Sequence, residues 1–212
     1  MYDRNETEAL WSQMLTGARC NSSKGVTLTT VNHVEMSWGG WKELHPDTRV
    51  ISGSTGFNRN YRQYPYGDYE IEDNSNVLFP MDNLDCRRPP KERALGIPGE
   101  DGAALTFPFG LLDEIGEKAV VKTNFEGGEV LVLWDRAKQS AVAFRPETEN
   151  GVAVNISVEN GEFVDATSAT VFGADGLGLE GQLASQSLRA IDEAYVAFWF
   201  AWPAFHPNTM IF

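Results

Sequence analysis

The sequence predicts an α+β protein that is rich in β-strands, with internally duplicated antiparallel β units and short peripheral helices that carry tryptophan. Two observations lead to this fold class. A tryptophan–histidine–proline signature occurs twice, and a repeated signature is typical of a repeated structural unit. Between the two copies, short alternating apolar segments are separated by turn residues, which is typical of antiparallel strands.

The two copies of the signature lie 161 residues apart, the distance from His45 to His206. They hold four of the six tryptophans and two of the three histidines of the chain. The first copy is Trp38-x-x-Trp41-x-x-x-His45-Pro46-Asp47-Thr48-x-Val50, and the second is Trp199-x-x-Trp202-x-x-x-His206-Pro207-Asn208-Thr209-x-Ile211. The same shift matches Trp11 with Phe172, Gly17 with Gly178 and Thr7 with Ser168.

The repeat predicts how the chain is organised. We expect residues 1–51 to form the C-terminal half of repeat A, residues 52–90 to form a long connection, and residues 91–212 to form a complete repeat B, all within one compact domain. Half a repeat cannot bury its apolar face. The favoured interpretation is therefore that an N-terminal half-repeat is missing from this chain, and the alternative is a naturally short chain that forms a homodimer.

The signature itself predicts a helix at Ser37–His45, because Trp38, Trp41 and His45 then share one face. Gly39 and Gly40 each cost this helix about 1 kcal/mol relative to alanine, so packing of the tryptophans is expected to hold it. Pro46 ends the helix, and a short strand is expected at Arg49–Ser52. A second helix is expected at Tyr195–Phe205.

Repeat B predicts one further helix and a series of strands. The helix is expected at Pro108–Ile115, with Pro108 in its first turn and Gly116 at its C-terminal end. A turn at Glu126-Gly127-Gly128 predicts a hairpin. The expected strands are Ala94–Ile97, Ala119–Phe125, Glu129–Trp134, Ala141–Arg145, Val152–Val158 and Glu162–Ala166.

Composition excludes several classes of function. The formal net charge of −13 argues against binding of nucleic acid, which requires a cationic surface, and against binding of an anionic membrane. No apolar run is long enough to span a membrane. Cys20 and Cys86 are too far apart in sequence for a short metal-ligand pair, and a disulfide and two free thiols fit the sequence equally well.

Candidate binding residues gather in and after the long connection. Tyr61, Tyr64 and Tyr66 lie among charged residues, a composition used for recognition of glycans or peptides. The favoured alternative is that they anchor an irregular loop to the domain. Lys91 and Arg93 could bind an anionic group, or pair with the acidic loop before them, which we prefer. The full candidate set is Arg59, Tyr61, Tyr64, Tyr66, Asp68, Lys91 and Arg93.

The signature residues are predicted to be structural. His45 and His206 each end a helix, where an imidazole can bond a terminal carbonyl and pack on the neighbouring indole. This role is favoured over a catalytic or metal-binding one, because the histidine occurs in both copies and both copies must build the same turn at the end of the helix. The structural set is Trp38, Trp41, His45, Trp199, Trp202 and His206. No nucleophile elbow, P-loop or dinucleotide motif occurs, so no catalytic residue, metal or cofactor is assigned.

The chain resembles a bacterial and archaeal family, the domain of unknown function numbered 3179. The resemblance rests on Met1-Tyr2-Asp3-Arg4, Thr7–Gln13, Leu15-Thr16-Gly17, Trp41 with His45–Thr48, Tyr64–Tyr69, Pro89–Arg93 and Phe198–Thr209. It implies a segment before Met1 similar to residues 94–144, with a Cys-Pro-x-Cys-Gly motif whose counterpart at Trp134–Gln139 has no cysteine. It also implies export or lipid anchoring, for which the sequence itself gives no support.

Three functions follow as hypotheses. The first is a non-catalytic, β-rich module that binds a small molecule, a glycan or a protein through the Ser52–Pro90 loop. The second is a fragment of a redox or metal-dependent enzyme whose cysteine motif lies upstream of Met1. The third is a scaffold for other domains.

Overall fold

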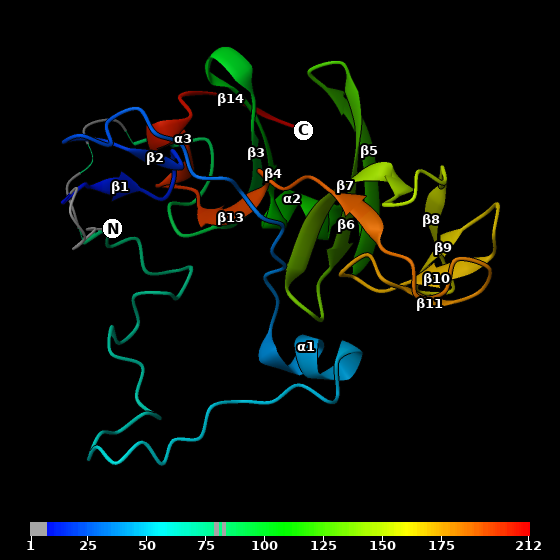
Figure 1. The fold of residues 1–212 in the computed structure, drawn as a ribbon, viewed down its shortest axis with the longest axis horizontal. Helices are drawn as coiled ribbons and strands as arrows, with labels where there is room; N and C mark the ends of the chain where they lie inside the picture. The colour runs from blue at the N-terminus through cyan, green and yellow to red at the C-terminus, as the bar shows by residue number, and fades with distance from the viewer. Residues whose placement is uncertain (1–7, 79–80, 82–83) are drawn as a thin grey trace.

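The computed structural model describes residues 8–78, 81 and 84–212. The predicted match of Thr7 with Ser168 therefore lies outside the described residues. Three four-stranded sheets make up the body, and a short hairpin of β1 (Trp11–Ser12) and β2 (Gly17–Ala18) lies beside it (Figure 1). The structure confirms the predicted fold class, α+β and rich in β-strands.

The central sheet has the order β12-β7-β6-β5 and is antiparallel. Its strands are β5 (Lys118–Phe125), β6 (Gly128–Asp135), β7 (Ser140–Thr148) and β12 (Leu188–Ala190). Glu126 and Gly127 join β5 to β6, and both have a positive φ, as a tight two-residue hairpin turn requires. The predicted hairpin is confirmed.

A second sheet, with the order β13-β3-β4-β14, packs against one face of the central sheet. Its strands are β3 (Arg93–Pro98), β4 (Ala103–Pro108), β13 (Tyr195–Phe198) and β14 (Asn208–Ile211). A 3-10 turn, η1 (Glu100–Gly102), joins β3 to β4. β14 runs parallel to β4, whereas the other pairs are antiparallel.

The third sheet, with the order β11-β10-β9-β8, covers the opposite face of the central sheet. Its strands are β8 (Ile156–Glu159), β9 (Glu162–Asp165), β10 (Thr170–Phe172) and β11 (Gly178–Glu180). The three sheets lie side by side in Figure 1, with β3 and β4 to the left of the central strands and β8–β11 to the right.

Both faces of the central sheet are buried, because successive side chains of a strand point to opposite sides. On β6, Val130, Val132 and Trp134 belong to the core shared with β3, β4 and α2 (Phe109–Ile115). Leu131 and Leu133 belong to the core shared with the third sheet. Burying two faces makes this sheet the frame on which the other elements are placed.

The helices differ in part from the prediction. α1 (Trp38–Leu44) forms where a helix was expected, with the Ser37 hydroxyl accepting a hydrogen bond from the Gly40 amide at its start. α3 is only Trp202–Phe205, and Tyr195–Phe198 is strand β13, so the helix predicted over Tyr195–Phe205 is wrong in its first half. Tyr195–Phe198 pairs along its whole length with β3, and Pro203 suits the first turn of the shorter helix.

The strand predicted at Arg49–Ser52 is wrong, since these residues form no strand. β4, which was not expected, explains the difference: the stretch that the signature matches to this segment in sequence, β14, becomes a strand by pairing with β4. Residues 49–52 have no such neighbour among the described strands. α2 begins one residue after Pro108 and ends at the predicted Gly116.

The hairpins β1–β2 and β10–β11 have the same pattern of internal hydrogen bonds. Equivalent residues of the two hairpins lie 160 residues apart, whereas the two signatures lie 161 residues apart. The Leu28 amide donates to the Thr16 carbonyl, and the Leu188 amide donates to the Gly176 carbonyl. The isolated bridge between Gly17 and Thr27 likewise recurs between Leu177 and Ser187. In backbone geometry Gly17 therefore corresponds to Leu177, and the predicted match with Gly178 is wrong by one residue.

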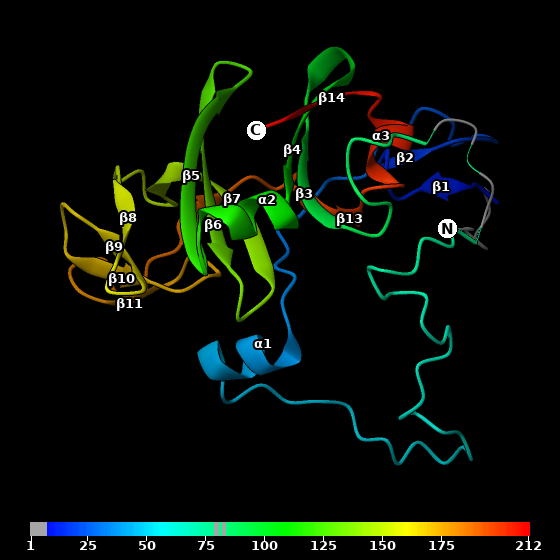
Figure 2. The same cartoon turned by 180° about the vertical axis from the view of Figure 1, so that it is seen from behind.

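α1 and the segment after it lie outside the three sheets. Figure 2, seen from behind, shows α1 below the central strands and the following segment extending away from the body, as in Figure 1. No strand or helix occurs between α1 and β3 in the part of the chain that the structure describes.

Candidate functional site

The two signature segments have the same local geometry, and we name them corner A (Ser37–Ile51) and corner B (Phe198–Phe212). In corner A the Trp41 indole donates to the Thr48 hydroxyl at 2.8 Å, and the His45 ring lies 4.2 Å from the Trp41 ring. In corner B the Trp202 indole donates to the Thr209 hydroxyl at 2.9 Å, and the His206 ring lies 4.1 Å from the Trp202 ring. Both corners therefore lock a histidine and a threonine onto one indole.

The histidine backbone also ends the helix in both corners. The amide of His45 donates to the Trp41 carbonyl, and the amide of His206 donates to the Trp202 carbonyl. Their φ and ψ angles are −129° and 69° in corner A, and −127° and 67° in corner B. The predicted bond from the imidazole to a helix carbonyl is not what the structure has, because both imidazoles bond other partners.

The two corners differ in what covers them. Trp199, Trp202, His206 and Thr209 are buried in corner B. In corner A, Trp38 is 50 % exposed and Ile51 is 96 % exposed. The same local structure is thus part of the core in one half of the chain and part of the surface in the other.

Corner A is attached to the body through the turn between β6 and β7. The Ser37 amide donates to the Lys138 carbonyl, and the Lys138 ammonium pairs with Glu43 at 2.7 Å. A Cβ at Gly40 would lie 2.8 Å from the Lys138 side chain, so only glycine allows this approach. The helix is held by its glycine face rather than by its tryptophans, contrary to the prediction. Hydrogen bonding and the positive charge of Lys138 lower the pKa of Glu43.

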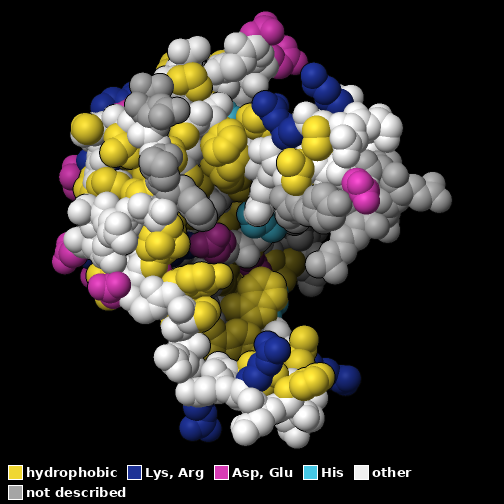
Figure 3. Space-filling view, turned by 90° about the vertical axis from the view of Figure 1, so that its left-hand side faces the viewer, with side chains coloured by type: hydrophobic (Ala, Val, Ile, Leu, Met, Phe, Trp, Pro, Cys, Tyr) yellow, Lys and Arg dark blue, Asp and Glu magenta, His cyan; other side chains and the backbone are white. Residues whose placement is uncertain are grey.

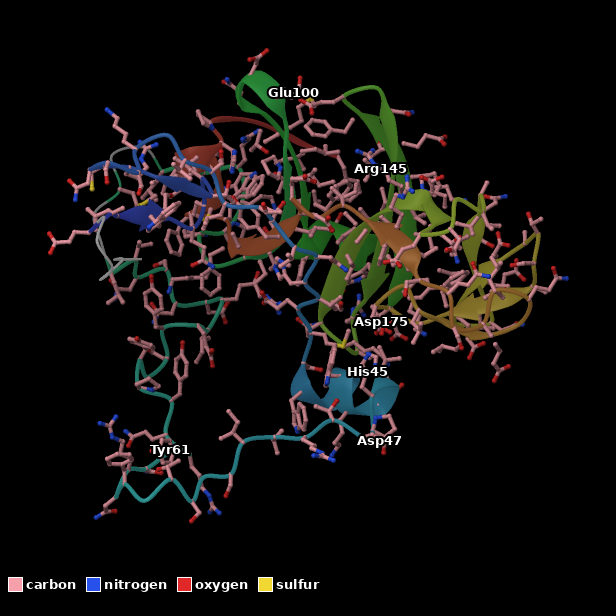
Figure 4. All side chains as sticks on the ribbon, in the orientation of Figure 1. His45, Asp47, Tyr61, Glu100, Arg145 and Asp175 are labelled. Carbon is pink, nitrogen blue, oxygen red and sulfur yellow. The ribbon has the colours of Figure 1, made fainter. Side chains whose placement is uncertain are left out.

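His45 makes the second attachment. Its Nε2 lies 2.8 Å from the carboxylate of Asp175, in the turn between β10 and β11. Figure 4 shows the two residues next to one another, His45 just after α1 and Asp175 in the turn above it. The half-exposed imidazole therefore has a partner 130 residues away in sequence.

Corner B faces a cavity of about 650 Å³ beside the β1–β2 hairpin. His206 Nε2 lies 2.9 Å from the Tyr195 hydroxyl, which is also 3.2 Å from the Met14 carbonyl. Burial lowers the pKa of His206 and raises the pKa of Tyr195. Both shifts favour the uncharged side chains, and the pair joins the second sheet to the N-terminal hairpin.

The connection after corner A is an extended arm, which we define as Ser52–Leu78. Phe57, Tyr61, Tyr64 and Tyr66 are exposed along it. The Tyr64 and Tyr66 rings meet edge to face at 5.7 Å, and the Tyr61 hydroxyl bonds Thr55 at 2.8 Å. In Figure 4, Tyr61 lies at the end of the arm that is far from the sheets. These four aromatic side chains of the arm are thus exposed rather than packed into the core.

The arm meets the body at Lys91. This lysine is 1 % exposed, and its ammonium donates to the Tyr69 carbonyl and lies 3.5 Å from the centre of the Tyr69 ring. A buried cation on an aromatic face is a favourable arrangement. Lys91 therefore fixes the base of the arm beside β3.

A cleft of about 560 Å³ lies between the base of the arm and the second sheet. Its aromatic wall is formed by Phe109, Trp134 and Phe198, and its acidic wall by Glu70 and Glu72 of the arm. Partial burial, followed by repulsion from Glu92 and Asp73, raises the pKa of Glu72. Figure 3 shows a hollow between the body and the lobe below it, with hydrophobic side chains inside it.

Two arginines beside the cleft are already paired with carboxylates. Arg88 binds Glu92 through two bonds of 2.6 Å, and Glu92 also accepts from the Gly110 amide at 2.9 Å. Arg93 pairs with Glu35 and lies over the Phe109 ring. The sequence had suggested that Arg93 pairs with the acidic loop, and its partner is Glu35 instead.

A family model described as Protein of unknown function (DUF3179) matches residues 1–209. The chain belongs to the DUF3179 family. Comparison with the curated proteins and with the solved structures found no match.

The candidate binding residues of this DUF3179 chain fall into two groups. Arg59, Tyr61, Tyr64 and Tyr66 lie on the outer arm, and Asp68 lies exposed near its base. Lys91 and Arg93 line the cleft. The structure thus places the seven residues along one path from the outer arm to β3, without bringing the tyrosines into the cleft.

The sequence interpretation missed Gly40, Lys138 and Glu92. A glycine pair inside a short helix was the available sign of a close approach, but its partner, a lysine in a distant turn, could not be found from spacing. Arg88 and Glu92, which form a partly buried ion pair, are four residues apart in sequence. Because this spacing is also common between charged residues on solvated segments, it did not identify the pair.

The DUF3179 chain holds two free thiols, Cys20 and Cys86. Among the described residues, no group of three histidine, cysteine, aspartate or glutamate side chains is placed to hold a metal ion. Within the same residues, no helix is both long and apolar enough to cross a membrane.

Proposed function

We propose that this DUF3179 chain is a non-catalytic binding module that captures a protein partner with the outer part of its arm. The observation that carries the proposal is the exposure of Phe57, Tyr61, Tyr64 and Tyr66 on a segment that has no regular structure. Exposed aromatic side chains are costly to hydrate and are enriched where proteins bind one another. A glycan or a small molecule stays the alternative ligand.

The geometry favours a protein over a small molecule at this surface. The exposed rings lie along an extended segment rather than around a pocket, whereas small ligands bind in concave sites. Asp68, Glu70 and Asp73 follow the tyrosines in the arm. A partner that offers apolar pockets rimmed by cationic groups would complement this surface.

We further propose that the two corners and the two hairpins are copies of one duplicated unit. Shared hydrogen bonds at a nearly constant offset support this proposal. Duplication accounts for the exposure of corner A and of the arm that follows it. In the second copy of the unit, the equivalent corner B is covered by strands β3 and β4.

Photo-cross-linking in the cells that make the protein tests the binding proposal. A photoreactive phenylalanine analogue in place of Tyr64 should form a discrete covalent adduct with a protein, and Tyr61→Ala with Tyr66→Ala should remove that adduct. The matched control position is Leu179, which is equally exposed on β11. Absence of any adduct at Tyr64, or the same adducts at Leu179, would show that the arm does not bind a protein.

A further inference from the structure

We propose that corner A is a docking site for a partner protein, which places a β-hairpin of the same design as β3–β4 on it. This site is separate from the arm tyrosines, and the inference does not depend on them. It rests on a comparison of the two corners, because β3–β4 packs on corner B.

At corner B, three residues of the β3–β4 hairpin contact side chains of the corner. Gly96 lies against the Trp202 ring so closely that a Cβ at this position would overlap the indole. The Thr106 hydroxyl bonds the Thr209 hydroxyl at 2.6 Å. Phe107 stacks on Phe212, with the ring centres 5.0 Å apart.

The hairpin also completes the backbone bonding of corner B. β4 pairs in parallel with β14, from Ala103 opposite Asn208 to Thr106 opposite Ile211. The Phe212 amide then donates to the Thr106 carbonyl. Corner B is therefore half of a site whose other half is a strand that runs parallel to it.

Corner A presents the matching half of the same site. Trp41, Thr48 and Ile51 occupy the places of Trp202, Thr209 and Phe212. Trp41 and Thr48 already make the internal hydrogen bond that positions Thr209 in corner B. Thr48, Val50 and Ile51 are exposed and pair with no strand among the described residues.

These positions specify the chemistry of the occupant. It has two antiparallel strands, with a glycine facing Trp41, a hydroxyl side chain facing Thr48, and an apolar or aromatic side chain facing Ile51. Its second strand runs parallel to Asp47–Val50. Main-chain pairing of this kind gives affinity, and the side-chain positions give specificity.

A second copy of this chain is a poor occupant. Both edges of its β3–β4 hairpin are already paired, with β13 and with β14, and its Gly96 is covered by its own Trp202. The arm does not occupy the site in the structure either, because it extends away from the body and forms no strand among the described residues.

A hairpin peptide tests the proposal directly. The probe is the sequence Arg93–Pro108, closed by a disulfide between cysteines added at its two ends and first shown by cross-strand NMR contacts to be folded. Titration into the full chain should shift the Trp41 indole resonance, assigned with Trp41→Phe, and should protect the amides of residues 48–51. We expect saturable binding with a Kd of about 1 mM or tighter.

Two matched variants give the expected specificity. The same peptide with Gly96→Val should bind about tenfold more weakly or not at all, because its side chain overlaps the indole. The protein variant Thr48→Val should weaken binding of the original peptide about two- to tenfold, through loss of one hydroxyl pair.

A tethered version removes the dependence on intrinsic affinity. When the hairpin sequence is joined to the N-terminus by a long flexible linker, its effective concentration is about millimolar. The fusion should resist urea better than the chain alone, and Gly96→Val in the added copy should abolish the gain.

Several results would overturn the proposal. These are a shift of Trp202 without Trp41, equal binding of the Gly96→Val peptide, or a fusion no more resistant to urea than its Gly96→Val version. If the chain alone is a dimer in which Trp41→Ala exposes residues 48–51, a second copy occupies corner A instead. Protection of residues 48–51 that is lost when Ser52–Leu78 is deleted would identify the arm as the occupant.

Discussion

His206 is a buried imidazole with a single polar partner on its Nε2 atom, the hydroxyl of Tyr195. Trp202 covers one face of the ring, and no carboxylate pairs with it among the described contacts. Burial without a compensating charge disfavours the protonated form, so the pKa of His206 is lowered. His45, at the same place in corner A, has the carboxylate of Asp175 as its partner instead.

The free energy of unfolding should fall as the solution is acidified below the ordinary pKa of histidine, about 6.5. Below that pH the unfolded chain binds a proton at His206 that the folded chain resists, so proton binding favours unfolding. The loss grows until the pH reaches the lowered pKa of the folded state and then stays constant. Urea unfolding followed at a series of pH values between about 7 and 5 measures it.

The variant His206→Gln should remove this part of the pH dependence, since glutamine can bond Tyr195 but does not titrate. His33→Gln is the matched control for replacing a histidine, because His33 is exposed on the surface. A His206→Gln protein with the slope of the original protein would show that another group is responsible.

Helix α1 is attached to the body by a close approach that its sequence tolerates only through glycine. Gly40 faces Lys138, whereas a Cβ at Gly39 would meet nothing nearer than the Ser37 hydroxyl, at 4.0 Å. The two glycines are neighbours in one helix, so they share its helix propensity and differ in what they face. Their replacement by alanine separates these two effects.

Gly39→Ala should stabilise the protein, or its α1 segment, by up to about 1 kcal/mol through helix propensity. Gly40→Ala should instead destabilise the attachment by about 1–3 kcal/mol, because the new methyl group overlaps the Lys138 side chain. Urea unfolding gives the global effect, and exchange of the α1 amides gives the local one. Equal gains in both variants would contradict the close approach.

Elements set by local pattern could be predicted from the sequence, and elements set by a distant partner could not. Glu126-Gly127 fixes a hairpin turn locally, so β5 and β6 were predicted within one residue. Val50 and Ile51 match Ile211 and Phe212 in sequence, yet only the second stretch becomes a strand, because β4 lies beside it. Tyr195–Phe198 likewise becomes a strand by pairing with β3.

The same limit applies to the candidate site. Composition identified the tyrosine-rich segment and the basic residues after it, and these do lie along the arm and the cleft. The partners Glu35, Glu43 and Lys138 come from parts of the chain far away in sequence. Spacing alone contains no information about such pairs.

Across the whole molecule, each corner contacts the hairpin of the other half. Corner A, which follows β1–β2, bonds the β10–β11 turn through His45 and Asp175. Corner B, which follows β10–β11, reaches the β1–β2 turn through His206, whose partner Tyr195 also bonds the Met14 carbonyl. These two contacts join the N-terminal part of the described chain to its C-terminal part. The surface formed by the tryptophan and the residues after the histidine is covered by β3–β4 in corner B and not in corner A.

This asymmetry predicts unequal costs for the same substitution in the two corners. Trp202→Ala should lower the free energy of unfolding by about 3–5 kcal/mol, because it empties a fully buried site. Trp41→Ala should cost only about 1 kcal/mol, because the indole is only partly buried and none of the described strands packs on it. Urea unfolding of both variants at one pH gives the comparison, and equal losses would show that corner A is covered in solution. In the protein with a tethered hairpin, the cost of Trp41→Ala should rise toward that of Trp202→Ala, since the same glycine–indole contact would then form in both halves.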